Sequence, residues 1–335
     1  DVENKPNIYF IILDEYAGFI QLKNDFNFDN SDFRIELEKR DFFVAKESFS
    51  NYPNTSLSVP SIINMIYFDF IPDKLGKDSK NIRVVNKMVN ENNVMKILQA
   101  NGYKITTLDA AVSDTADAYL ADIRLCNSIF DINPDIRKNF AVVYVPIVSL
   151  RELIFDEVIR SKLECSFSAL MDFNEDPKNP DFVVAHLRFP HHPFIYDSFG
   201  NSVSSNDMGD KDGYLEQLKF ANKKTLEIID SIQERSSENI IIIISDHGYR
   251  YYINWENPTV DDYIRGFNNL SAYYLPGEEK HETIALVNIF RTIFNSYLEM
   301  NYEILEDRYI WYSPEKPFDH NDVTDLIIDY LKNSS

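Results

Sequence analysis

The chain has 335 residues, of which 44% are hydrophobic and 14% aromatic, with only 9 Gly and 14 Pro. This composition is typical of a compact globular protein and excludes a disordered chain. The net charge of -21 excludes non-specific binding to nucleic acid or to an anionic membrane face, because both need a basic surface.

No segment has the roughly 18 to 20 uninterrupted apolar residues that a transmembrane helix needs. The chain starts at Asp1 and not at a methionine, so we expect that upstream sequence has been removed. Cys126 and Cys165 are the only cysteines, which excludes a disulfide framework and leaves one bridge open. We expect two buried free thiols instead, and cysteine usage does not decide the cellular compartment.

Short apolar segments rich in β-branched residues predict the strands. In chain order, the predicted strands are Ile8–Leu13, Phe42–Ala45, Tyr103–Leu108, Asp181–Leu187 and Ile240–Ile244. The last of these is a run of five isoleucines, which is too short to cross a membrane and too β-branched for a good helix. It therefore predicts a central strand that is buried on both faces.

Helical spacing and capping residues predict helices between these strands. The predicted helices run from Ser31 or Asp32 to Arg40, Ser58 to Met65, Val94 to Ala100, Leu150 to Leu163, Tyr214 to Ile232, and finally Glu282 to Tyr297. Proline is tolerated in a first turn and not in a helix interior. Pro60 therefore predicts a helix start near Ser58, with Thr55 just ahead of it.

Two segments give no regular pattern, Asn133–Pro146 and the loop Arg188–Asp212. Elsewhere the alternation of helices and strands predicts an α/β fold with a largely parallel central sheet. We find no internal repeat and no linker rich in Pro, Gly or Ser. The sequence therefore predicts one domain over residues 1–335, in which residues from about 280 to 335 are a candidate small subdomain.

Polar residues follow the predicted strands at the points where these strands end. Asp14 follows Leu13, and Asp246 and His247 follow the isoleucine run. Because the carboxyl ends of parallel strands meet at one edge of a sheet, we expect these side chains to lie close together. Two carboxylates and an imidazole suit zinc or manganese, and the hydroxyl of Thr55 can fill a fourth position.

A divalent cation can activate a coordinated hydroxyl as a nucleophile. A position just before a helix also favours an incoming phosphate, because the N-terminal end of a helix is positive. Each residue has a simpler explanation as well. Asp246, His247 and Gly248 could form only a turn, and Thr55 could be only a helix cap.

The motifs resemble those of the alkaline phosphatase and sulfatase superfamily, in the branch that includes lipoteichoic acid synthases and phosphoethanolamine transferases. The matching segments are NIYFIILDE at 7–15, SNYPNTSLSVPSIINM at 50–65, HLRFPHHPF at 186–194, ISDHG at 244–248, FNNLSAYYLPG at 267–277 and ALVNIFRTIFNSYL at 285–298. The resemblance implies a three-layer α/β/α fold like that of alkaline phosphatase. It also implies that Asp14, Asp246 and His247 bind a metal ion, with Thr55 as nucleophile and fourth ligand.

The resemblance implies further roles around this centre. His191 fits the His-x-Pro spacing of a family histidine that contacts the phosphate or the leaving group, and His192 is the alternative. Glu15 matches a second acidic ligand of some sulfatases, or could orient a ligand from behind it. Arg250 and Arg265 could pair with phosphate oxygens.

Departures from the wider superfamily narrow the chemistry. The segment from Thr55 to Val59 lacks the Cys-x-Pro-x-Arg pattern of formylglycine sulfatases, which argues against sulfate ester hydrolysis. With only six histidines in the chain, a second metal site is not expected. The sequence therefore predicts one divalent ion, zinc or manganese, with magnesium or calcium as alternatives.

The functional interpretation is a phosphotransferase that works through a covalent phosphothreonine. It would move a phosphoethanolamine- or phosphoglycerol-type group from a lipid donor to a cell-surface glycan or lipid. The resemblance implies a site on the extracytoplasmic face of the membrane, in the periplasm or at the cell surface, in a protein that is membrane-anchored at full length. A phosphodiesterase or phosphatase and a non-catalytic binding module are the two alternative functions.

Overall fold

The computed structural model describes residues 5–110, 119–126, 148–278 and 282–334. Within this part of the chain, seven strands form one sheet in the order β2-β7-β6-β1-β5-β3-β4. Their bounds are β1 Ile8–Leu13, β2 Phe43–Val44, β3 Lys104–Ala110, β4 Ile123–Leu125, β5 Asp181–Leu187, β6 Ile240–Ile244 and β7 Ser271–Tyr274. All neighbouring strands pair in parallel except β7, which is antiparallel to both β6 and β2.

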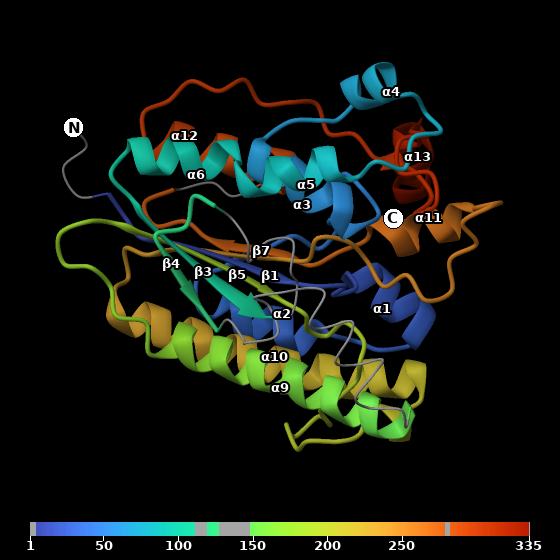
Figure 1. Cartoon of the computed structure of the whole chain (residues 1–335), viewed down its shortest axis with the longest axis horizontal. Helices are drawn as coiled ribbons and strands as arrows, with labels where there is room; N and C mark the ends of the chain where they lie inside the picture. Colours follow the sequence, from blue (N-terminus) through green and yellow to red (C-terminus); the bar gives the residue numbers. More distant parts are fainter. Residues whose placement is uncertain (1–4, 111–118, 127–147, 279–281, 335) are drawn as a thin grey trace.

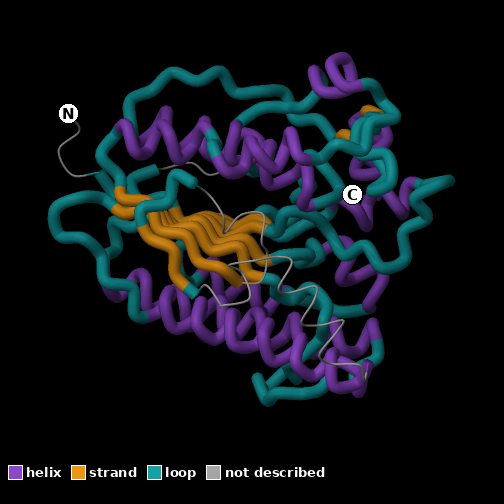
Figure 2. The backbone as a smooth tube through the Cα atoms, viewed as in Figure 1, coloured by secondary structure: helices purple, strands orange, loops and turns teal. Residues whose placement is uncertain are grey.

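Helices cover both faces of the sheet, so that the molecule has three layers (Figures 1 and 2). One layer contains α1 Phe19–Phe26, α2 Ser31–Glu38, α9 Val148–Met171 and α10 Asp210–Arg235. The opposite layer contains α3 Thr55–Asn64, α5 Arg83–Asn90, α6 Asn93–Ala100 and α12 Ile289–Tyr297. This arrangement confirms the predicted α/β class with a largely parallel central sheet.

The alternation of side chains along β1 explains why both faces need a helical layer. Tyr9, Ile11 and Leu13 are buried in the core on the side of α9 and α10. The intervening residues, such as Phe10, are buried in the core on the side of α3 and α12. Every residue of β1 and of β6 is buried, as the isoleucine run predicted for a central strand.

A smaller region lies beside the main layers. It contains the two-stranded sheet of β8 Ile310–Trp311 and β9 Asn321–Asp322, together with α11 Val260–Phe267 and α13 Thr324–Ser334. Phe267, Trp311 and Ile327 belong to the core that these elements share. The remaining helices in the described part of the chain are α4 Phe70–Leu75 and the two short 3-10 helices Ser205–Asp207 and Leu286–Asn288.

Several predicted element bounds were wrong. Helix α3 begins at Thr55 and not near Ser58, because the side chain of Asn54 caps it by accepting a hydrogen bond from the Ser56 amide. Pro60 therefore lies inside the helix.

The helix expected from Glu282 begins later as α12, and α13 replaces it as the last helix. Helix α9 is longer than predicted, and α10 begins inside the expected loop Arg188–Asp212. Strand β7 was not predicted at all. The segment Asn133–Pro146 lies entirely outside the described residues.

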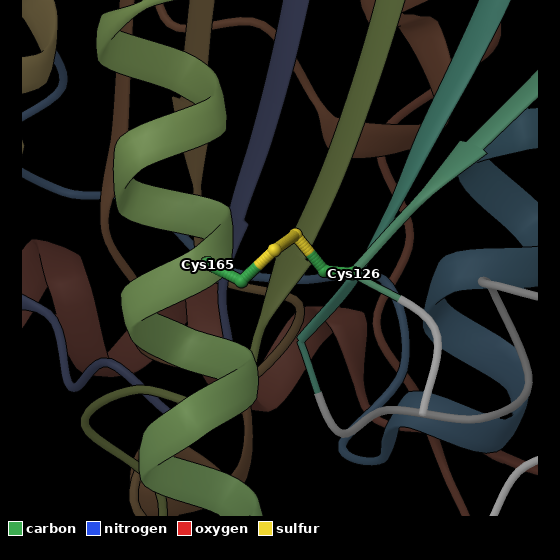
Figure 3. The surroundings of a disulfide bond; sticks show 2 residues. All are labelled: Cys126 and Cys165. Carbon is green, nitrogen blue, oxygen red and sulfur yellow. A yellow bond between two sulfur atoms is a disulfide. The ribbon is translucent and has the colours of Figure 1, made fainter. Parts of the chain in front are cut away.

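The expectation of free thiols was wrong, because Cys126 and Cys165 form a disulfide (Figure 3). Cys126 directly follows β4, Cys165 lies on α9, and their Cα atoms are 5.6 Å apart. The two cysteines are 39 positions apart in the sequence, so only the packing of α9 beside β4 brings them together. None of the helices in the described residues is both long and apolar enough to cross a membrane.

Candidate metal centre and active site

Three of the candidate metal ligands, Asp14, Asp246 and His247, form a cluster at the carboxyl ends of β1 and β6, which are neighbours in the sheet. Asp14 directly follows β1, and Asp246 and His247 come just after β6. All three residues are at least 95% buried, since their exposed fractions are 5%, 0% and 0%. The predicted convergence of these strand ends at one edge of the sheet is therefore confirmed.

His247 is the centre of this cluster. Its Nε2 atom lies 3.4 Å from Asp246 Oδ2 and 3.7 Å from Asp14 Oδ1. The hydroxyl of Thr55, the first residue of α3, lies 3.0 Å from the same nitrogen. The fold thus brings together all four residues that the sequence proposed as metal ligands, although the structure does not by itself assign that role.

The hydrogen bond made by Nδ1 of His247 shows which ring nitrogen carries the proton. Nδ1 lies 2.8 Å from the carbonyl oxygen of Gly248, and since a carbonyl can only accept, Nδ1 carries the proton. The lone pair of Nε2 then faces the carboxylates and Thr55. Burial, and after it the charge of Arg250, lowers the pKa of His247 well below its usual value, so the imidazole is neutral, as a metal ligand must be.

The carboxylates of Asp14 and Asp246 have the surroundings expected of cation ligands. Asp14 Oδ1 and Asp246 Oδ2 are buried and have no hydrogen-bond partner in the structure, although buried polar atoms are normally paired. Burial and the neighbouring Asp246 raise the pKa of Asp14 well above its usual range. Four ligands at about 2.0 to 2.1 Å from a tetrahedral zinc ion would be about 3.3 Å apart, which is close to the separations around His247 Nε2.

His186 is a candidate ligand that the sequence analysis missed. One atom each from Asp14, His186 and Asp246 can be chosen so that all lie within 4.8 Å of one another. Burial lowers the pKa of His186 to about 4, so this imidazole is also neutral. Within the apolar run of β5 it has the pattern of a core residue. The available signal was its position one residue before the end of a strand that pairs with β1.

Glu15 connects the cluster to two other predicted site residues. Its Oε1 atom accepts hydrogen bonds from the Arg250 amide at 3.1 Å and from Arg250 Nε at 3.4 Å. Its Oε2 atom lies 3.5 Å from Nε2 of His191. Burial acts to raise the pKa of Glu15, but His191 and Arg250 outweigh it and the net pKa is lowered. Glu15 is therefore an anion held between these two side chains.

The two histidines of the HHPF segment have different surroundings. His191 is largely buried, with Nδ1 2.6 Å from the carbonyl oxygen of His192 and Nε2 facing Glu15. His192 is exposed, and its ring packs edge-on against Phe194. Of the two, His191 is the one that the structure connects to the cluster.

Arg265 forms ion pairs with two acidic residues, Asp25 and Asp262. It lies on α11, where Nε and Nη2 each donate to a carboxylate oxygen of Asp25 at 3.0 Å. Nη1 is also 3.3 Å from Asp262. Arg265 thus forms a bidentate ion pair with Asp25. Its suggested contact with a phosphate stays a prediction.

The backbone around the Asp-His-Gly turn is held from several sides. Ser58 Oγ donates to the carbonyl of Asp246 at 2.6 Å, and Ser245 Oγ donates to the carbonyl of His247 at 2.7 Å. At Gly248, a Cβ atom would lie 2.2 Å from the carbonyl oxygen of Arg265. Only glycine permits this approach, and the same residue supplies the carbonyl that orients His247.

Comparisons with known proteins show the family and the fold of the chain. The model of the family described as Sulfatase matches residues 6–295, whereas a comparison with curated protein sequences gave no match. The chain is similar in structure to the C-terminal periplasmic domain of EcEptC from Escherichia coli in complex with Zn. This match has 12% identity and a TM-score of 0.56, over 96% of this chain and 93% of that one.

Two further solved structures share the fold. The lipoteichoic acid synthase LtaP from Listeria monocytogenes matches with 12% identity and a TM-score of 0.53, over 95% of this chain and 76% of that one. A protein in the alkaline phosphatase superfamily from Vibrio parahaemolyticus matches with 13% identity and a TM-score of 0.56, over 93% and 74% of the two chains. At such identities the likeness shows a common fold.

Proposed function

Because the chain belongs to the sulfatase family, we propose that it is a metal-dependent phosphotransferase with Thr55 as its nucleophile. The observation that carries this proposal is the contact of Thr55 Oγ1 with His247 Nε2 at 3.0 Å. Beside it lie two buried carboxylate oxygens, from Asp14 and Asp246, that lack hydrogen-bond partners. The hydroxyl of Thr55 is therefore close to two buried carboxylate oxygens whose negative charge a cation would neutralise.

Asp14, Asp246, His247 and Thr55 would hold one divalent ion, with His186 as a further candidate ligand. Zinc or manganese suits this set of oxygen and nitrogen donors. When bound, such an ion lowers the pKa of a coordinated hydroxyl and stabilises charge on phosphoryl oxygens. Among the described residues no second group of His, Cys, Asp and Glu side chains is close enough to hold another ion, so the cluster suits a single ion.

The residues of the chain would then act as follows. The hydroxyl of Thr55 releases its proton to solvent and its oxygen attacks phosphorus, the bond from phosphorus to the leaving alkoxide breaks, and a phosphothreonine forms. His191 in its protonated form, paired with Glu15, gives a proton to the departing alkoxide or holds a phosphoryl oxygen, and Glu15 holds both His191 and Arg250 in position for the phosphate. The N-terminal end of α3, at which Thr55 lies, adds a positive field for the phosphate.

The donor that we propose is a lipid that carries a phosphoethanolamine- or phosphoglycerol-type group, and the acceptor a cell-surface glycan or lipid. The disulfide between Cys126 and Cys165 supports a site outside the cytoplasm, since such bonds persist in oxidising compartments. We propose that the full-length protein is anchored to the membrane, with this domain on the extracytoplasmic face.

The test compares Thr55→Ala with Thr324→Ala. Thr324 is a matched control because it is also the first residue of a helix, α13, and lies outside the cluster. We expect Thr55→Ala to fold and to lose turnover of a phosphodiester, and Thr324→Ala to keep it. Intact mass measurement of wild type after exposure to donor should show a phosphorylated species that Thr55→Ala lacks. Full activity in Thr55→Ala would refute the mechanism.

A hydrolase is the second candidate, in which water releases the phosphothreonine. Product analysis with and without a glycan acceptor separates the two, because only a transferase forms a new phosphodiester. A non-catalytic module is the third. Purified protein that contains no zinc, manganese or magnesium and takes up none would favour that function.

A further inference from the structure

A second cavity lies next to the proposed active site. It has a volume of about 910 Å³ and lies between the segment 253–263, which continues the loop from Asp246 and His247, and the segment 311–321 around β8 and β9. Trp255, Tyr263, Trp311 and Tyr312 supply its aromatic surface. All residues of its lining belong to the described part of the chain, and none has a role in the mechanism above.

The aromatic surface is rigid. The indole of Trp255 stacks on that of Trp311, with ring centres 4.9 Å apart and an angle of 23° between the planes. Tyr263 packs edge-on against Trp311 from another direction. Gly266 makes room for this arrangement, because a Cβ atom there would lie 2.8 Å from the ring of Trp311. Trp255 remains partly exposed, and forms a fixed flat surface that lines the cavity.

The charge of the lining restricts the ligand. Glu256, Glu315 and Asp319 line the cavity with Lys316 as the one basic residue, so the local charge is negative. An anionic ligand would be repelled, whereas a neutral or cationic one would not. Carboxylates accept hydrogen bonds from hydroxyl and ammonium groups, and the flat C–H face of a sugar ring can bury apolar area on an indole.

The cavity is linked to the nucleophile through Tyr312. This side chain lines the cavity, and its hydroxyl lies 3.0 Å from Ser56 Oγ and 3.4 Å from the carbonyl oxygen of Asn54. Asn54 caps the helix that Thr55 begins. A ligand in the cavity would therefore be separated by one side chain, that of Tyr312, from the residues on both sides of Thr55.

We propose that this cavity binds a neutral or amino-substituted saccharide, which serves as the acceptor of the transferred group. The acceptor role rests on the proposed function, whereas the binding of saccharide does not. In the transfer step a sugar hydroxyl attacks the phosphorus of phosphothreonine. The bond from phosphorus to Thr55 Oγ1 breaks, and the hydroxyl proton ends on that oxygen.

Binding can be measured apart from catalysis because the chain contains only two tryptophans, and both line this cavity. The Thr55→Ala protein is titrated with cellotriose, with a glucosamine trisaccharide and with a sulfated trisaccharide of the same length, and tryptophan fluorescence is recorded. We expect a saturable change with the first two and at least tenfold weaker binding of the third. Equal or tighter binding of the sulfated sugar, or no change with any of them, would overturn the proposal.

Variants identify the surface that binds. By calorimetry, Trp255→Ala should weaken binding of cellotriose about tenfold, Trp255→Phe less so, and the exposed control Phe199→Ala not at all. Glu315→Gln should weaken the glucosamine trisaccharide more than cellotriose. An equal loss in Phe199→Ala, or binding of ethanolamine without binding of any saccharide, would contradict the assignment.

A transfer assay then tests the acceptor role. In an otherwise wild-type protein, Trp255→Ala should raise the KM for the saccharide and leave hydrolysis of the donor by water unchanged. An unchanged KM overturns the acceptor role. Saccharide binding without any transfer by wild type would instead refute the phosphotransferase function and leave the binding site standing.

Discussion

Replacing Asp246 with asparagine should stabilise the metal-free protein and remove most of its response to metal. One oxygen of Asp246 and one of Asp14 lie within 4.8 Å of each other. At that separation, with an effective dielectric constant of about 20, two like charges repel by about 3.5 kcal/mol. Proton uptake by Asp14, whose pKa is raised by burial and by Asp246, relieves part of this repulsion. We therefore expect the free energy of unfolding to rise by about 1 to 3 kcal/mol in Asp246→Asn.

The assay is urea unfolding at neutral pH, first with a chelator and then with zinc. Wild type should gain about 2.7 kcal/mol when the zinc concentration is 100 times the dissociation constant, and Asp246→Asn only a small part of this. Asp307→Asn is the control, because Asp307 is partly buried and accepts hydrogen bonds from Asn51 and Tyr309. It should keep the full gain from zinc, because Asp307 lies outside the cluster. An Asp246→Asn protein that is less stable than wild type without metal, or that gains as much from zinc, would refute the reasoning.

Four other predictions test the surroundings of the site. Gly248→Ala should lower the free energy of unfolding by about 1 to 3 kcal/mol, because the new Cβ meets a backbone oxygen at 2.2 Å; urea unfolding measures this loss. Glu15→Gln should keep its metal content by elemental analysis and lose about 10- to 100-fold in kcat/KM, since it positions Arg250 and His191; loss of bound metal would instead make Glu15 a ligand. Burial raises the pKa of Asp307, so its stabilising contribution is present below about pH 4 and is lost as pH rises through the raised pKa. Unfolding free energies measured against pH should therefore show wild type losing stability relative to Asp307→Asn over that range. Replacing Cys126 and Cys165 together by serine should cost about 3 to 4 kcal/mol, because their bridge closes a loop of 39 residues; a thermal midpoint equal to that of wild type would contradict this.

Much of the active centre was predictable because its signals are local. An apolar strand that ends at an acidic residue is visible in a few consecutive letters, and this holds for both Asp14 and Asp246. Since strands of this kind are parallel and buried, their carboxyl ends meet at one edge of the sheet. The sequence also predicted a helix start close to Thr55. The error of about three residues arose because the cap formed by Asn54 outweighed the cost of Pro60 inside the helix.

Other features depend on residues that meet only after folding. His186 has the sequence pattern of a core residue and becomes a candidate ligand only because β5 pairs with β1. The ion pair of Arg265 with Asp25 forms only because α11 packs against α1. The stack of Trp255 on Trp311 has no counterpart in any local pattern of the sequence.

The sequence by itself determined the strands β1, β2, β3, β5 and β6, the chemistry of the ends of β1 and β6, and the family of folds, because burial and periodicity are properties of neighbouring residues. The tertiary structure alone decided which distant groups meet: the disulfide of Cys126 with Cys165, the hydrogen bonds and ion pairs of Glu15, and the aromatic cavity beside Thr55. These contacts depend on how α9, α11 and β8 pack against the rest of the molecule. That packing is set by the shape and total area of the surfaces that are buried together, which no single segment contains.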